Sequence, residues 1–410
     1  MKAKEAFMNL HSVKRLLSSL FAQMDGGIRI RFWDGSELMA GSVKGAEPVA
    51  GISFKSREAL ARVFANPSLG FGEGYMRGDI EVEGSLEALL EYIFSKNLTE
   101  SLGTGDKLRL CWLKLRGGHS IKHCKRDVQT HYDRGNSFYR LWLDTDMNYS
   151  CAYFETEDEG LEEAQRRKNL HSLRKLRLKE SERLLDIGCG WGALVKMAAR
   201  EFRAYAVGIT LSRQQQQLAS QRVEEEGLED RAEIRLQDYR EIPAREHGTY
   251  DKIISIGMFE HVGREKYRTF FRKAARLLKD KGLFLLHTIC RMVPEELDPW
   301  LSTYIFPGGY IPSMGQVLEA AAKEGFEILD VEDLRRHYDL TIGHWLDRFE
   351  QAAGTIAEMK GKEFVRMWRL YLASSRMSFR SGGMHVCQFL FAKGRIAHEL
   401  PLTRRWMHCP

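Results

Sequence analysis

The sequence predicts two domains: a doubly wound α/β domain and, before it, a smaller α+β domain. The chain has 410 residues, and a typical domain has roughly 150. From about residue 182 onward, short apolar strands alternate with helices, as in a parallel sheet that carries helices on both faces. The first hundred residues instead mix amphipathic helices with strands of alternating polarity.

The N-terminal part opens with a helix expected over residues 5–24, whose apolar side chains recur at helical spacing. Its apolar stretch is short and lacks a small-x-small cleavage site, so we expect an amphipathic helix and no secretory signal. No stretch predicts a membrane-spanning helix. The further elements expected here are a strand at 28–32, a helix at 57–65, a glycine-punctuated segment at 70–84 that ends in a strand, and a helix at 86–94.

The C-terminal part is expected to form one sheet with its covering helices. Its strands are predicted at 182–187, 204–209, 232–236, 250–256 and 283–287, with closing strands at 326–331 and 384–392. Its helices are predicted at 193–202, 212–226 and 267–278. The expected domain boundaries are therefore 1–118 for the N-terminal domain with a basic linker, 119–394 for the α/β domain and 395–410 for a tail.

Composition and charge narrow the classes of partner and compartment. The chain is 43% hydrophobic and 29% charged, which is ordinary for a globular protein. It has 62 Lys and Arg against 56 Asp and Glu, and a net charge of +6 does not predict a nucleic-acid partner. Its seven cysteines are scattered, with no C-x-x-C pair, so we expect no disulfide framework and no metal site. A reducing, cytoplasmic compartment fits this cysteine pattern.

One stretch, residues 104–126, is strongly basic. It holds seven Lys and Arg side chains and a single acid, Asp106. Such a patch can hold phosphates, including lipid head groups, at about 1 kcal/mol per charge near an anionic surface. On charge alone, a solvated linker explains the stretch equally well.

A glycine-rich loop follows the first strand of the α/β part. The segment DIGCGWG places Asp186, Gly188, Gly190 and Gly192 between that strand and the next helix. Glycines let the backbone turn tightly and approach a ligand, and the helix supplies free N–H groups. The spacing differs from G-x-G-x-x-G, and Asp238 and Tyr239 follow a later strand, which favours S-adenosylmethionine over a nicotinamide cofactor. A tight turn that binds nothing is the alternative.

Further motifs make the pattern specific. In chain order they are HYDRGNSFY (131–139), YSCAYF (149–154), LLDIGCGWG (184–192), GITLS (208–212), LQDYR (236–240), IGMFEHVG (256–263), LLHTI (285–289), DPWLSTYIFPGG (298–309) and HYDLT (337–341). Together they resemble the cyclopropane-fatty-acyl-phospholipid synthases and are similar to the mycolic acid cyclopropane synthases. The resemblance covers 119–394, and FGEGYMRGDIEVEG (71–84) is similar to the N-terminal domain of full-length bacterial synthases.

The resemblance implies a Rossmann-like class I methyltransferase domain preceded by a lipid-associating domain. It implies methylene transfer from S-adenosylmethionine to the cis double bond of an unsaturated phospholipid, with bound bicarbonate as the base. The bicarbonate ligands would be Cys151, Glu260, His287, the backbone of Ile289, and Tyr338. The S-adenosylmethionine contacts would be Tyr149, Ser150, Gly188, Gly190, Thr210, Gln215, Asp238 and Tyr239. It also implies a homodimer bound peripherally to the inner face of the membrane, and the basic stretch favours anionic lipid.

Each candidate residue also has a purely structural interpretation. Cys151 could be a small buried hydrophobe, Glu260 a helix cap, and His287 a core histidine. What favours a site is that Glu260 and His287 both follow or end predicted parallel strands, where ligands bind in such folds. Aromatic faces can stabilise a carbocation, and the unassigned candidates are Phe154, Trp300, Tyr304 and Phe306.

Other functions remain open from the sequence. A same-family enzyme could make a methyl-branched or methylene-bearing acyl chain instead of a ring. A more distant alternative methylates a small soluble substrate, and another is a lipid-binding protein with a vestigial cofactor site. In the helix before the last strand, many family members carry a cysteine, and Ser375 matches it here, so no covalent cysteine step is expected.

Overall fold

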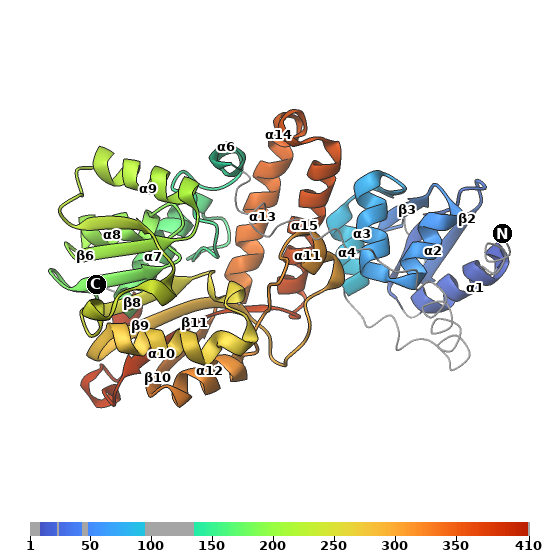
Figure 1. Ribbon diagram of the computed structural model, residues 1–410. Coiled ribbons are helices and arrows are strands. Elements are labelled where there is room, and N and C mark those ends of the chain that lie inside the picture. The colour runs from blue at the N-terminus through green and yellow to red at the C-terminus, as the bar shows by residue number, and fades with distance from the viewer. Residues whose placement is uncertain (1–8, 23, 43–47, 95–134, 409–410) are drawn as a thin grey trace. The chain divides into compact units, whose positions relative to one another are not determined.

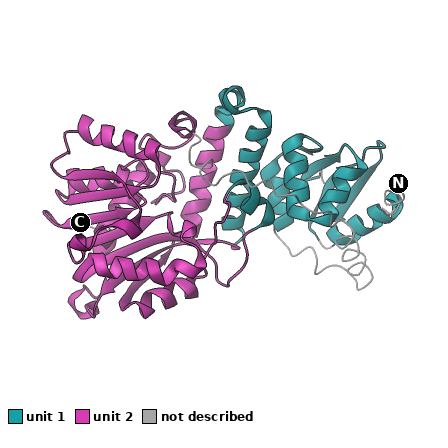
Figure 2. Ribbon diagram, viewed as in Figure 1, with its two compact units in different colours: residues 1–126, 298–305, 350–381 teal, residues 127–297, 306–349, 382–410 magenta. Residues whose placement is uncertain are grey.

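The computed structural model describes residues 9–22, 24–42, 48–94 and 135–408, and these form two compact units. Unit 1 comprises Met1–Arg126, Asp298–Ile305 and Glu350–Ser381. Unit 2 comprises Asp127–Leu297, Phe306–Phe349 and Gly382–Pro410 (Figure 2). The basic stretch at 104–126 lies outside the described residues.

Unit 1 holds a four-stranded sheet in the order β2-β1-β3-β4. Its strands are β1 (Gly26–Arg31), β2 (Glu37–Ser42), β3 (Ala50–Phe54) and β4 (Ile80–Glu83). β1 is antiparallel to β2 and parallel to β3, which is antiparallel to β4. The helices of the N-terminal part are α1 (Leu10–Phe21), α2 (Arg57–Ala65), α3 (Pro67–Arg77) and α4 (Leu86–Phe94). The predicted small α+β domain is therefore confirmed.

The glycine-punctuated segment at 70–84 ends in the strand β4, as predicted, but its first part belongs to the helix α3, which was not predicted. Asn66 caps this helix through Leu69 N–H, Pro67 takes a first-turn position, and Gly78 ends it in a left-handed conformation. Glycine disfavours helices, but here it permits close packing. A Cβ built on Gly72 would lie 2.3 Å from Cδ1 of Trp300, and one on Gly70 would lie 2.3 Å from backbone atoms of Arg62.

The units do not follow the chain in the way that the expected boundaries do. Unit 1 also takes in α11 (Pro299–Tyr304), α14 (Ala353–Lys360) and α15 (Lys362–Arg380). Polar contacts tie these helices to its N-terminal part: Arg366 donates to Ile80 O at 3.0 Å and to Glu81 at 2.9 Å. Tyr304 donates to Glu73 at 3.0 Å. The compact unit is assembled from three stretches, whereas the sequence predicted one continuous stretch.

Unit 2 holds a seven-stranded sheet in the order β10-β11-β9-β8-β5-β6-β7 (Figure 1). β7, β6, β5, β8 and β9 pair in parallel, while β11 is antiparallel to both β9 and β10. The sheet is therefore mixed, with the two closing strands turned. The bounds are β5 (Arg183–Ile187), β6 (Tyr205–Thr210), β7 (Ala232–Leu236), β8 (Tyr250–Ile256), β9 (Leu278–Cys290), β10 (Phe326–Asp333) and β11 (His385–Lys393).

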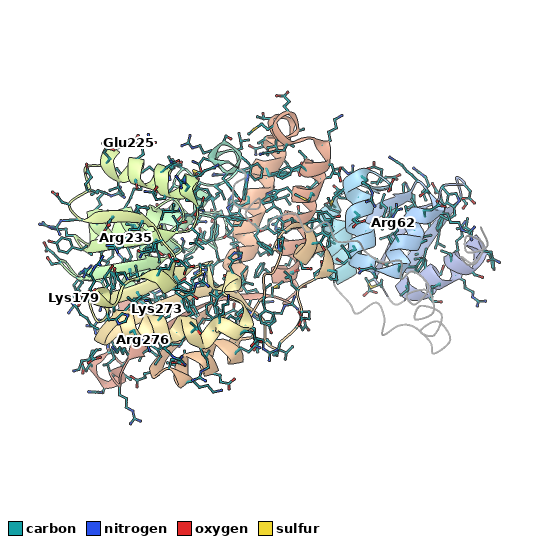
Figure 3. All side chains as sticks on the ribbon, in the orientation of Figure 1. Arg62, Lys179, Glu225, Arg235, Lys273 and Arg276 are labelled. Atoms are coloured by element: carbon teal, nitrogen blue, oxygen red, sulfur yellow. The ribbon has the colours of Figure 1, made fainter. Side chains whose placement is uncertain are left out.

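Helices cover both faces of this sheet because successive strand residues point to opposite sides. Leu184 of β5 joins a core with α7 (Leu161–Lys175), α8 (Ala193–Glu201) and α9 (Arg213–Glu225). The next residue, Leu185, joins the core with α10 (Tyr267–Leu277) and α12 (Met314–Lys323). Charged side chains such as Lys179, Glu225 and Arg276 lie on the outside (Figure 3). Unit 2 also contains α6 (Asn136–Arg140) and most of α13 (Arg335–Gln351). The last two residues of α13 fall in unit 1.

The segment expected as a tail packs onto unit 2. It forms the short helices η6 (Ala397–Glu399) and α16 (Arg405–His408). Met407 is buried, and its carbonyl lies 3.1 Å from Nδ1 of His171 on α7. The sequence did not predict this packing, because a segment with such short helices shows no periodic pattern of apolar residues. No helix in the described ranges has the length and apolar character needed to cross a membrane.

We predict that Gly72→Ala lowers the stability of unit 1. The new methyl group would collide with the buried Trp300 ring, and overpacking of this kind costs about 1–3 kcal/mol. Scanning calorimetry on the purified chain should show a lower unfolding temperature.

Gly354→Ala is the matched control, because Gly354 lies in α14 of the same unit and its Cβ would meet nothing within 4 Å. This change should leave stability unchanged or raise it by up to about 1 kcal/mol. Equal unfolding temperatures in the two variants would contradict the close-packing role of Gly72.

Candidate functional site

The glycine loop lies at the carboxyl end of β5, directly before α8. Gly188, Gly190 and Gly192 all have positive φ angles, of 92°, 56° and 82°. The N–H groups of Gly188 and Cys189 donate to Ile209 O at 3.0 Å, which fixes the loop to β6. A Cβ on Gly188 would lie 2.8 Å from that of Met258, but one on Gly190 would meet nothing within 4 Å. Space beside the Gly190 backbone therefore remains available to a ligand.

Two further pairs of predicted cofactor contacts lie at or after the ends of β6 and β7. At the end of β6, Thr210 donates its hydroxyl proton to the side-chain oxygen of Gln215 at 2.7 Å. After β7, Asp238 accepts from the backbone and guanidinium of Arg240, which lowers the pKa of Asp238. Tyr239 sets its ring edge-on to Phe270, with centroids 5.3 Å apart. Asp238 thus has a cation partner within its own turn.

A buried lysine connects two other predicted contacts, and sequence reasoning missed it. Lys168 of α7 lies with its amino group 3.2 Å from Ser150 Oγ and 3.4 Å from Asn148 Oδ1. Burial lowers the pKa of Lys168 to about 8, although the nearby Asp144 and Asp186 carboxylates oppose this shift. Burial raises the pKa of Asp186 to about 7, and the Lys168 charge opposes that rise. A lysine in so charged a helix carries no signal of burial in the sequence.

Tyr149 lies in a cluster of aromatic rings. Its centroid is 5.5 Å from those of Tyr139 and Trp142, and 5.3 Å from that of Trp345 on α13. Trp345 in turn packs edge-on to Tyr338, at 5.9 Å. Rigid aromatic packing therefore links the predicted cofactor contact Tyr149 to the predicted ligand Tyr338.

Cys151 and Tyr338 meet at one backbone carbonyl, that of Leu334. The Cys151 sulfur lies 3.7 Å from Leu334 O and 3.2 Å from Ala152 O, and Tyr338 N–H donates to Leu334 O at 3.0 Å. Burial raises the pKa of the Cys151 thiol, so it stays protonated. A protonated thiol is a weak hydrogen-bond donor and a poor nucleophile.

Glu260 lies in the short helix η4 (Phe259–His261), just after β8. Its Oε1 accepts from Ile289 N–H at 2.6 Å, so two of the predicted ligands are in direct contact. Its Oε2 is buried and has no hydrogen-bond partner among the described residues. Burial raises the pKa of Glu260, while the Ile289 N–H and the nearby Thr288 hydroxyl favour the charged form.

His287 lies near the carboxyl end of β9 and is 1% exposed. Its Nδ1 is 3.3 Å from Nε2 of Gln388 on β11. Its own Nε2 is buried without a partner in the described part of the chain. Burial, together with the cations Lys168 and Lys175, lowers the pKa of His287 to about 3, so the ring is neutral.

The site therefore contains two buried, unpartnered polar atoms: Glu260 Oε2, in the helix η4 that follows β8, and His287 Nε2, on the adjacent parallel strand β9. Buried polar atoms of this kind are usually satisfied by an ordered water or a small ion. A carboxylate oxygen accepts a hydrogen bond, and a protonated ring nitrogen donates one. A small ion with one O–H group and further acceptor oxygens fits both, and bicarbonate has this donor and acceptor set.

The four aromatic candidates divide between the units. Trp300 and Tyr304 belong to unit 1, where Trp300 donates to Met76 Sδ at 3.3 Å and packs over Gly72. Phe154 stacks on His344 in unit 2, with centroids 5.5 Å apart. Phe306, also in unit 2, lies 6.4 Å from the His261 ring. Packing accounts for the burial of Trp300.

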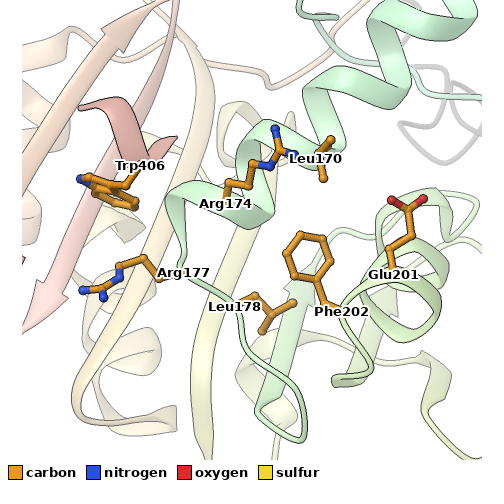
Figure 4. A pocket seen from close by; sticks show the side chains of 7 residues that line it. All are labelled: Leu170, Arg174, Arg177, Leu178, Glu201, Phe202 and Trp406. Atoms are coloured by element: carbon orange, nitrogen blue, oxygen red, sulfur yellow. The ribbon is translucent and has the colours of Figure 1, made fainter. Parts of the chain in front are cut away.

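A surface pocket of about 410 Å³ lies elsewhere on unit 2 (Figure 4). Its lining residues are Leu170, Arg174, Arg177, Leu178, Glu201, Phe202 and Trp406. None of the predicted site residues is among them. The buried polar atoms are therefore better evidence for the site than the shape of this pocket.

Comparisons with known proteins agree with the motifs. Residues 119–389 match the family described as mycolic acid cyclopropane synthetase, and residues 13–102 match a domain of unknown function, DUF7884. A probable fatty acid methyltransferase of Pseudomonas putida is 35% identical over 392 residues, covering 93% of this chain and 96% of the relative. The cyclopropane-fatty-acyl-phospholipid synthase of Escherichia coli K12 is 37% identical over 360 residues, covering 86% and 90%.

Solved structures give the same result for the larger part of the chain. The cyclopropane synthase MmaA2 from Mycobacterium tuberculosis superposes with a TM-score of 0.62 at 35% identity, covering 65% of this chain and 97% of that one. Mycolic acid cyclopropane synthase CmaA1 complexed with SAH and CTAB gives 0.61 at 37% identity, with the same coverage. The chain belongs to the mycolic acid cyclopropane synthetase family and is an S-adenosylmethionine-dependent methyltransferase with the class I fold.

Proposed function

We propose that this chain transfers a methylene group from S-adenosylmethionine to the cis double bond of unsaturated phospholipid acyl chains, forming a cyclopropane ring. The observation that carries the proposal is the pair of buried, unpartnered polar atoms, Glu260 Oε2 and His287 Nε2. A methyltransferase that acts only on a strong nucleophile has no need for a buried anion site. The names of the Escherichia coli and mycobacterial relatives point to the same chemistry.

The proposed reaction needs alignment more than activation. An alkene has no acidic proton, so no side-chain base is required for methyl transfer, and the sulfonium of S-adenosylmethionine supplies the electrophile. Holding the two reactants in line is worth several kcal/mol of the barrier. The open space beside Gly190 and the Thr210–Gln215 pair at the end of β6 are the features that fit the cofactor.

After methyl transfer, a proton must leave the new methyl group before the ring can close. When bound, bicarbonate supplies an oxygen base for this proton. Glu260 would accept from its O–H group through Oε2, while Ile289 N–H holds the other carboxylate oxygen in place. His287 would donate through Nε2, and the family resemblance adds Cys151 and Tyr338. Burial of His287 also limits access of water, which would otherwise add to a carbocation.

A methyl-branched acyl chain is the second candidate product, and the name of one relative, the probable fatty acid methyltransferase of Pseudomonas putida, supports it. If the proton leaves a chain carbon instead of the new methyl group, the product keeps a double bond and carries a methyl branch. Ring and branch therefore differ only in which C–H bond is broken. The product, and not the first step, distinguishes the two functions.

We predict that expression in a host with unsaturated phospholipids yields acyl chains heavier by one methylene, with ring signals and no residual double bond. Lipid mass spectrometry combined with proton NMR checks this result. Glu260→Gln should lower conversion at least about 100-fold, as the loss of a group that orients a base does. Heavier chains that retain a double bond would show a branched product and contradict ring closure.

Two controls isolate the role of Glu260. Glu246→Gln changes another partly buried carboxylate, which bonds Tyr250 and Arg235 away from the predicted site, and should leave turnover unchanged. Purified wild type should lose activity in bicarbonate-depleted buffer and regain it on addition. Full turnover by Glu260→Gln, with S-adenosylmethionine still bound, would refute the proposed anion site.

We also predict that Gly190→Val abolishes stabilisation by S-adenosylmethionine. Wild type should melt at a higher temperature with the cofactor, since a ligand at a hundredfold excess over its Kd adds about 2.7 kcal/mol. The valine side chain would fill the open space beside Gly190. Thermal melting with S-adenosylmethionine, S-adenosylhomocysteine and NAD measures the effect.

Gly227→Val is the matched control for backbone strain. Gly227 has a φ of 63°, close to the 56° of Gly190, and also has nothing within 4 Å of its Cβ position. Both variants should lose stability, because a side chain in this conformation costs about 1–2 kcal/mol. Only Gly190→Val should lose the cofactor shift. A shift with NAD, and none with S-adenosylmethionine, would overturn the site assignment.

We propose further that the chain binds membranes peripherally through the basic stretch at 104–126. A substrate double bond lies within the acyl layer, so the enzyme must approach a bilayer. Seven cations can contribute several kcal/mol near an anionic surface, at about 1 kcal/mol each before those that face away are discounted.

We predict stronger cosedimentation with phosphatidylglycerol vesicles than with phosphatidylcholine vesicles, and weaker binding as salt rises. Replacing four basic residues of the stretch by alanine should weaken binding while cofactor binding survives: Lys114, Arg116, Lys122 and Lys125. An alanine variant of four exposed cations of unit 2 removes the same charge elsewhere and should bind normally: Lys179, Arg203, Lys279 and Lys281. Insensitivity to lipid charge and to the first variant would favour apolar insertion instead.

A further inference from the structure

Gln388 lies directly opposite His287 in the antiparallel pairing of β11 with β9. Both side chains are buried, at 0% and 1% exposure, so their polar atoms must find partners within the protein. The Gln388 side-chain nitrogen reaches two of them: His287 Nδ1 at 3.3 Å and Ser172 Oγ, on α7, at 3.1 Å.

The partners of Ser172 decide which way the Gln388 amide faces. The Ser172 hydroxyl donates to Lys168 O, one turn back in α7, at 2.8 Å. A hydroxyl has a single proton, so Ser172 can only accept from Gln388. The amide group beside Ser172 must therefore be the NH₂, which has a second proton for His287.

The reverse orientation of the amide is less favourable. Gln388 Oε1 is buried and has no partner among the described residues. Turning the amide over would put the NH₂ there, and two donors would then be buried without acceptors instead of one carbonyl oxygen. A buried donor left unpaired is destabilising, because it loses its hydrogen bond to water and gains none in return.

We propose that Gln388, oriented by Ser172, fixes His287 in the tautomer that carries its proton on Nε2. A neutral imidazole has one donor and one acceptor nitrogen, and Nδ1 is the acceptor because it faces an N–H group. The unpartnered Nε2 is then a donor. Gln388 is a positioning residue, since it acts only through His287.

This inference rests on the proposed anion site, because the tautomer matters only if Nε2 faces an anion. With the proton on Nε2, His287 can donate to an anion oxygen. With the proton on Nδ1, a nitrogen lone pair would face the same oxygen and repel it. A change of one amide on the neighbouring strand can therefore convert a binding group into a repelling one.

Nuclear magnetic resonance of the full-length chain labelled with ¹⁵N-histidine reads the tautomer directly. Two-bond ¹H–¹⁵N spectra separate a protonated ring nitrogen from an unprotonated one, and the His287→Gln spectrum identifies the His287 signals among the 13 histidines. Wild type should show Nδ1 unprotonated and Nε2 protonated. A proton on Nδ1 in wild type would overturn the inference without any activity measurement.

Gln388→Glu is the decisive variant, because an ionised carboxylate only accepts hydrogen bonds. It should move the proton to Nδ1 or give a doubly protonated ring, and turnover should fall about 10- to 100-fold, as it does when a supporting partner is lost. An unchanged His287 pattern in folded Gln388→Glu would contradict control by Gln388.

Ser172→Ala tests the orienting step if the first variant does not fold. It frees the Gln388 amide to turn, so His287 should show a mixture of tautomers. Ser378→Ala is matched, since Ser378 donates to Ser374 O at 2.9 Å with the same one-turn geometry in α15 of unit 1. Identical His287 signals in both serine variants would overturn the role of Ser172.

The tautomer measurement and the bicarbonate dependence of turnover can fail independently of each other. A wild-type Nε2–H tautomer that responds to Gln388→Glu supports the inference even if turnover proves independent of bicarbonate. That second result would refute the bicarbonate site alone. Bicarbonate-dependent turnover with the proton on Nδ1 would leave the site standing and refute the role of Gln388.

Discussion

The candidate site depends on one hydrogen bond, from Ile289 N–H to Glu260 Oε1 at 2.6 Å. A carboxylate removed from water is costly unless it is paired or hydrogen-bonded. This bond holds one oxygen and leaves the other, Oε2, without a partner among the described residues. The bond forms only because β8 and β9 run parallel in register, with Ile256 opposite His287, so the loop after one strand meets the end of the next.

That arrangement could be predicted from the sequence to a considerable extent. Strands buried on both faces give apolar runs, and the predicted 232–236 and 250–256 match β7 and β8 residue for residue. Once parallel strands are recognised, their carboxyl ends share one edge of the sheet. This edge is where the strand ends predict Glu260 and His287, which the family resemblance singles out as ligands. The Glu260–Ile289 contact then follows from strand order, although its distance does not.

The features that escaped prediction depend on contacts distant in sequence. The glycines of α3 argue against a helix locally, but Trp300, more than 200 residues away, fills the space above Gly72. Lys168 looks like a surface residue until α7 packs on the sheet. Gln388 and Ser172 carry no motif, and their relation to His287 arises only when β11 turns antiparallel beside β9. The periodicity of apolar residues predicts single helices and strands, but it does not predict which distant residues will be neighbours.

The unpartnered polar atoms of the site lower the stability of the fold. Glu260 Oε2, His287 Nε2 and Gln388 Oε1 are each buried without a partner in the described residues, at a cost of about 1–3 kcal/mol apiece. A fold optimised only for stability would replace them with apolar groups of similar shape. The two large apolar cores on either face of the sheet offset that cost. A bound ion that satisfied both Glu260 and His287 would regain part of that cost.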